Sequence, residues 1–65
     1  MSEITSQTAP VKSRILYKRG YGDISEATIL EWSSGGNVKF KYPSGYESWI
    51  DKSDLQYYRL IELLQ

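Results

Sequence analysis

A strict alternation of apolar and charged residues in the middle of the chain constrains the fold most. In the segment VKFKY, Val38, Phe40 and Tyr42 fall on one face, and Lys39 and Lys41 fall on the other. A period of two is the side-chain period of a β-strand, and no helix brings these three apolar residues to one side. The segment therefore predicts a strand with a buried face that includes Phe40 and a solvated face that carries the lysines.

Turn signals on both sides of this strand place further strands in the chain. The adjacent glycines and asparagine of SSGGN (33–37) accept positive φ easily, and PSG (43–45) turns the chain again. The strands expected around these turns are Ser13 to Tyr17, Ile24 to Trp32 (with Ala27 and Ile29 facing the core and Trp32 facing away from it), Val38 to Tyr42 and Tyr46 to Asp51. This order predicts an all-β fold: a small, strongly curled antiparallel sheet or barrel.

The last segment supports two interpretations. Ser53 to Gln56 fits a capping box with Ser53 as the N-cap, and Tyr57, Leu60 and Leu64 then follow at helical spacing. The same residues also suit a final strand that is entered through one tight helical turn, which would complete a barrel. The sequence leaves strand and short C-terminal helix open.

The start of the chain differs in composition from the rest. Residues 1–10 are mostly Ser, Thr, Gln and Ala around one Ile, which is typical of a flexible N-terminal leader. A total of 65 residues leaves room for one domain. We therefore expect a leader over residues 1–10 and a single free-standing domain over residues 11–65.

The composition speaks against catalysis. The chain has no Cys and no His, which removes the usual thiolate nucleophile, general base and metal ligands. Glu47 and Asp51 would share a strand face but lie about 13 Å apart along it. We expect no enzyme activity, no cofactor and no metal. Neither a signal peptide nor an apolar stretch of membrane-spanning length is visible, so the expected location is the cytoplasm.

The order of signals over residues 15–55 resembles the small SH3-like barrels, and among them the Tudor-type domains. The resembling segments are Ile15 to Tyr17, Glu26 to Ile29, Val38 to Tyr42, Ser44 to Tyr46, Trp49-Ile50 and Ser53 to Leu55. The resemblance implies a curled barrel and a cage of aromatic rings that holds methylated lysine or arginine, with Tyr17, Tyr42 and Tyr46 as walls. Where such domains carry a further ring, at the start of the second strand, this chain has Ser25.

Surplus aromatic residues point to a binding role. Six Tyr and two Trp are more than so small a core can hide, and exposed rings are enriched at interfaces. We predict a protein-binding module that acts as a small adaptor or inhibitor. The expected contact residues are Tyr17, Tyr21, Tyr42, Tyr46 and Trp32. Self-association would also bury surplus aromatic surface. We therefore also expect a homodimer that buries Trp32 or the C-terminal apolar stripe formed by Tyr57, Leu60 and Leu64.

Basic residues offer an alternative partner. Small barrels bind single-stranded nucleic acid with positive strips and stacking rings. The residues that would form such a strip are Lys12, Arg14, Lys18, Arg19, Lys39 and Lys41. Eight acids balance the eight bases of the chain, and an acidic C-terminal end opposes a phosphate backbone, so protein binding is the favoured interpretation.

Overall fold

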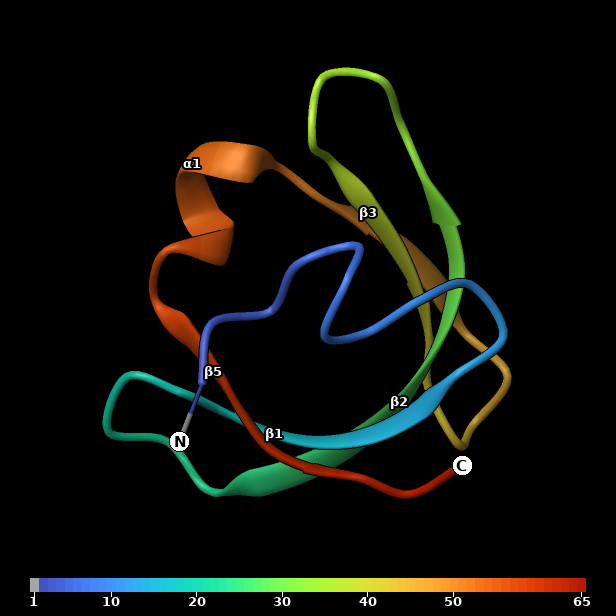
Figure 1. Cartoon of the computed structure of the whole chain (residues 1–65). Coiled ribbons are helices and arrows are strands. Elements are labelled where there is room, and N and C mark those ends of the chain that lie inside the picture. Colours follow the sequence, from blue (N-terminus) through green and yellow to red (C-terminus); the bar gives the residue numbers. More distant parts are fainter. Residues whose placement is uncertain (1) are drawn as a thin grey trace.

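The protein is built around one antiparallel sheet of five strands (Figure 1), in a computed structural model that describes residues 2–65. The strand order is β4-β3-β2-β1-β5, so β4 and β5 are the two edges. The elements are β1 (Arg14–Arg19), β2 (Ile24–Trp32), β3 (Val38–Lys41), β4 (Glu47–Ile50), the single-turn helix α1 (Lys52–Leu55) and β5 (Tyr58–Leu63). The all-β class predicted from the alternating segments is confirmed.

The core lies on one face of this sheet. Phe40, Ile15, Ile29 and Val38 are the largest fully buried side chains, and they come from the three central strands. The expected core positions of Phe40 and Ile29 are therefore confirmed. In β3 the buried residues alternate with Lys39 and Lys41, as the pattern of the segment predicts.

A β-bulge changes the side of the sheet on which Trp32 lies. The register between β2 and β3 shifts between Ile29 and Glu31, and Trp32 is then paired with the buried Val38. One inserted residue moves the following side chains to the other face. Trp32 consequently packs half-buried against the core, and the expectation that it faces away from Ala27 and Ile29 is wrong.

The last segment follows the strand interpretation, in which one tight helical turn precedes a final strand. α1 is one turn long and leads directly into the strand β5, which pairs antiparallel with β1. The N-cap of α1 is Asp51, and not Ser53 as the capping box predicts: Asp51 Oδ2 accepts hydrogen bonds from the Ser53 backbone N–H at 3.1 Å and from Ser53 Oγ. These bonds also lower the pKa of the Asp51 carboxyl.

The N-terminal residues pack onto the domain. Ser2 pairs with Leu60 on β5, and Ile4 and Ala9 belong to the core cluster, with Ile4 4% and Ala9 0% exposed. The indole Nε1 of Trp32 donates a hydrogen bond of 2.8 Å to the Ala9 carbonyl. Residues 2–10, expected as a flexible leader, thus make the contacts of a packed segment, and this segment crosses the open side of the sheet in Figure 1.

Candidate functional site

Five aromatic rings from β1, β3, the β3–β4 turn and the start of β5 form one network of ring contacts. We name them the aromatic cluster: Tyr17, Phe40, Tyr42, Tyr46 and Tyr58. Phe40 lies at its base, with ring centroids 5.3 Å from Tyr17, 5.9 Å from Tyr58 and 6.2 Å from Tyr42. Such tilted and edge-to-face pairs are favourable geometries for aromatic rings.

Exposure rises steeply across the cluster. Tyr17 and Tyr58 are 7% and 8% exposed, and their rings stack at 5.5 Å. Tyr42 is half-buried, whereas Tyr46 is 67% exposed. The solvent-facing part of the aromatic cluster is therefore the pair formed by Tyr42 and Tyr46.

The turn between β3 and β4 holds this pair together. Gly45 has a φ of +94°, which a residue with a side chain rarely adopts. Its N–H donates to the Tyr42 carbonyl at 2.8 Å, and the Tyr42 N–H donates to the Tyr46 carbonyl at 2.8 Å. The two tyrosines that flank the turn are thereby placed opposite each other, and their rings stack with centroids 6.1 Å apart and planes 11° apart.

A cation already lies on one ring of the cluster. The Arg19 guanidinium carbon is 5.7 Å from the centroid of the Tyr58 ring, within the range of a cation–π contact. Tyr17 stacks on Tyr58 and makes a tilted contact with Phe40, and Tyr42 stacks on Tyr46. The Tudor-type resemblance implies Tyr17, Tyr42 and Tyr46 as cage walls. These three tyrosines are thus neighbours, and each of their rings packs against other aromatic rings of the same chain.

Burial keeps the inner phenols protonated. Removal from water, together with the neighbouring phenols of Tyr42 and Tyr58, raises the pKa of Tyr17 to about 12, although the Ser25 hydroxyl acts in the opposite direction. Burial also raises the pKa of Tyr42. Both phenols therefore stay neutral to a higher pH than an exposed tyrosine does.

The raised pKa of Tyr17 predicts a loss of stability in alkali. Because the folded state favours the neutral phenol, its contribution to stability is complete below pH 10, the ordinary pKa, and disappears as the pH rises toward about 12. We expect urea-unfolding midpoints to fall between pH 10 and pH 12, and to fall less in Tyr17→Phe, which keeps the ring. Equal decreases in the wild type and the variant would contradict this assignment.

The other two predicted contact residues lie outside the aromatic cluster. Tyr21 is fully exposed in the β1–β2 turn, where it lines a shallow cleft of about 400 Å³ with Arg19 and the half-exposed Tyr57. Trp32 uses its indole N–H in the bond to Ala9. Tyr21 is therefore free for an external contact, whereas Trp32 anchors the N-terminal segment.

The basic residues do not form one uninterrupted strip. Lys39 forms an ion pair with Glu47 at 3.2 Å, and Arg14 lies 3.5 Å from Glu26. Lys39 and Lys41 are on the face of β3 away from the core, whereas Arg19 contacts Tyr58. Lys12 is in a turn with a φ of +76°, and Lys18 is half-buried on β1. Acidic side chains thus interrupt the positive surface at two points.

Tyr58 is the member of the cluster that the sequence does not single out. It begins β5 and pairs with Arg19 at the end of β1. Only the strand interpretation of the last segment places Tyr58 and Leu60 on one buried face, and the sequence leaves that interpretation open. The alternation of Tyr58 and Leu60 with the exposed Arg59 is the signal for it.

The described residues 2–65 contain neither a metal-binding cluster nor a membrane-spanning helix. Among residues 2–65, no three His, Cys, Asp or Glu side chains gather closely enough to hold a metal ion. No helix in the same part of the chain is long and apolar enough to cross a membrane.

Comparisons with known proteins give one short match. The chain is 54% identical over 26 residues to the lysine–tRNA ligase of Pyrococcus horikoshii. These 26 residues are 40% of this chain and 5% of the ligase. The matched part is thus a small fraction of the ligase. No model of a known protein family matches the chain, and no solved structure matches it.

Proposed function

We propose that the protein is a non-catalytic module that binds another protein through the Tyr42–Tyr46 pair. The observation that carries this proposal is a stacked pair of tyrosines with one ring 67% exposed and the other backed by the buried Phe40. Tyrosine supplies a large, amphipathic contact area at a low entropic cost, which favours its use at interfaces. A ring that is already held by its neighbours loses little further freedom on binding.

Several features support a peptide segment as the bound element. The exposed Tyr21 lines a shallow cleft with Arg19 at the β1–β2 turn, which offers such a segment a second contact point. The SH3-like resemblance of residues 15–55 fits this arrangement, since such barrels grip short segments between turns. By covering a surface of its partner, so small a module acts as an adaptor or an inhibitor.

Substitution of Tyr46 tests the proposal. Immobilised wild-type protein is exposed to extract of the cell that makes it, and captured proteins are identified by mass spectrometry and then titrated in pure form. We expect Tyr46→Ala to weaken binding at least about tenfold, because hot-spot tyrosines contribute about 2 kcal/mol or more. Tyr46→Phe, which keeps the stacked ring, should bind nearly as the wild type does.

Trp49→Ala is the matched control, because Trp49 is an exposed aromatic residue on β4 outside the aromatic cluster. Unchanged circular dichroism spectra show that each variant is folded. Equal loss of binding in the Trp49 and Tyr46 variants would exclude the pair as the contact site. A salt-sensitive affinity for single-stranded oligonucleotides that depends on Lys18 and Lys41 would favour the nucleic-acid alternative instead.

A further inference from the structure

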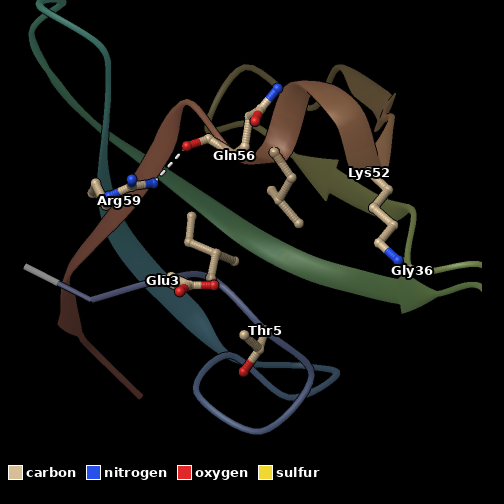
Figure 2. Close-up of a pocket in the computed structure, with 8 residues that line it drawn as sticks. Glu3, Thr5, Gly36, Lys52, Gln56 and Arg59 are labelled. Carbon is tan, nitrogen blue, oxygen red and sulfur yellow. Dashed lines mark hydrogen bonds between the residues drawn. The ribbon is translucent and has the colours of Figure 1, made fainter.

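A hollow on another part of the protein has the chemistry of a small-ligand site. It has a volume of about 420 Å³ and is bordered by the N-terminal segment, the β2–β3 turn, α1 and the start of β5. The residues that line it are Glu3, Ile4, Thr5, Gly36, Lys52, Leu55, Gln56 and Arg59 (Figure 2). None of them belongs to the aromatic cluster. Its size is within the range of pockets that hold small organic molecules.

The apolar side chains of the hollow come from the edge of the core. Ile4 and Leu55 are members of the core cluster and are both buried. They lie on different segments, the N-terminal segment and α1, which the fold brings together here. A ligand with an apolar body would remove further apolar surface from water by lying against them.

The backbone and side-chain stem of Lys52 are held in place at one side of the hollow. Its backbone N–H donates to Asn37 Oδ1 at 2.8 Å, which fixes the start of α1 to the β2–β3 turn. Its side-chain stem runs along Gly36, where a Cβ would lie only 3.2 Å from Lys52 Cδ. Gly36 also has a φ of +90°, so glycine suits both the turn and the close approach. Within residues 2–65 the Lys52 ammonium has no acidic partner within 4.0 Å.

Arg59 is held in place at the other side. Its Nη1 donates to the carbonyls of Gln56 at 2.6 Å and of Tyr58 at 2.8 Å, which fixes the plane of the guanidinium. Like Lys52, it forms no ion pair within the described part of the chain. Figure 2 shows Arg59 and Lys52 on opposite sides of the hollow. The one acid in the lining is Glu3, so the site keeps an excess of positive charge.

We propose that this hollow binds a small organic dianion of the dicarboxylate type. One carboxylate pairs with Lys52, the other pairs with Arg59, and the carbon chain between them lies on Ile4 and Leu55. Two cations on opposite sides of a hollow with apolar lining are complementary to a ligand with two anionic ends and an apolar middle. Hydrogen bonds between charged groups of this kind are among the stronger polar contacts in proteins.

The test uses three probes on the ¹⁵N,¹³C-labelled full chain in a phosphate-free buffer at pH 7. Adipate has two carboxylates on an apolar chain, hexanoate has one on a similar chain, and inorganic phosphate has no apolar part. We expect adipate to shift the Ile4 and Leu55 methyl signals saturably, and to bind about tenfold more tightly than hexanoate, since one charged contact is lost. Phosphate should leave these methyl signals in place.

Lys52→Gln should bring the affinity for adipate down to that for hexanoate, because the second carboxylate then has no cation. Lys41→Gln, at an exposed lysine on β3, is the matched control and should bind adipate as the wild type does. Arg59→Gln removes the second cation, but it also removes the backbone contacts of Arg59. If Arg59→Gln unfolds for that reason, Arg59→Lys is used instead, because it keeps the charge. The proposal is overturned if adipate gives no saturable shift, if Lys52→Gln binds it unchanged, or if phosphate shifts the same methyl signals to the same extent.

Discussion

Removal of residues 2–10 is expected to unfold the protein at room temperature. Ile4 is 4% exposed within the core cluster, and loss of a buried isoleucine side chain costs about 2–5 kcal/mol. The deletion also removes the Ala9 carbonyl that accepts the Trp32 indole hydrogen bond and leaves this half-buried donor unpaired. A domain of 65 residues has a total stability of only about 3–10 kcal/mol, so these losses are of the same size as the whole.

The measurement is thermal unfolding followed by circular dichroism for the truncated chain and for Ile4→Ala. Gln7→Ala is the control, because Gln7 is an exposed residue of the same segment. We expect the truncated chain to show no cooperative transition, Ile4→Ala to melt well below the wild type, and Gln7→Ala to melt with it. A truncated chain that melts at the wild-type temperature would show that the segment is a dispensable leader.

The composition of this segment does not reveal its packing. Ser, Thr and Gln at most positions are typical of disorder, and one Ile is a weak signal for burial. In the structure Thr5 and Thr8 hydrogen-bond to each other and to nearby backbone groups, which turns the segment and places Ile4 and Ala9 against the sheet. The packing of Ile4 and Ala9 depends on the finished sheet, and no periodic pattern in the sequence encodes it.

The central strands are the part of the fold that the sequence predicts best. The expected second strand, Ile24 to Trp32, has the same bounds as β2, and the alternation in β3 gives the correct buried face. Both rest on local periodicity, which a strand with one buried face imposes directly. The bulge between Ile29 and Glu31 breaks that periodicity, so the side on which Trp32 lies could not follow from alternation alone.

The candidate site, like the central strands, is predictable from the sequence only where local pattern determines it. Tyr42 and Tyr46 flank a recognisable turn with Gly45, so their proximity follows from the local sequence. Tyr58 joins the cluster through the pairing of β5 with β1, which links residues far apart in the chain. The hollow beside Lys52 depends on four separate segments, and no sequence motif brings them together.

Replacement of Phe40 by Ala is expected to cause the largest loss of stability among single substitutions in the cluster. Phe40 is fully buried, and its ring supports Tyr17, Tyr42 and Tyr58. Truncation of a core phenylalanine costs about 3–5 kcal/mol, because it removes buried apolar surface and leaves a cavity. In a small domain this loss is enough to populate the unfolded state substantially at room temperature.

Urea unfolding measures the effect, and near-ultraviolet circular dichroism reports whether the tyrosines keep their fixed environment. Phe40→Leu retains most of the apolar volume and should lose less stability, while the tyrosine signal weakens because the edge-to-face contacts are gone. Tyr46→Ala removes an exposed ring of the same cluster and should change stability by less than about 1 kcal/mol. If Phe40→Ala were as stable as Tyr46→Ala, Phe40 would not be the base on which the Tyr42–Tyr46 pair rests.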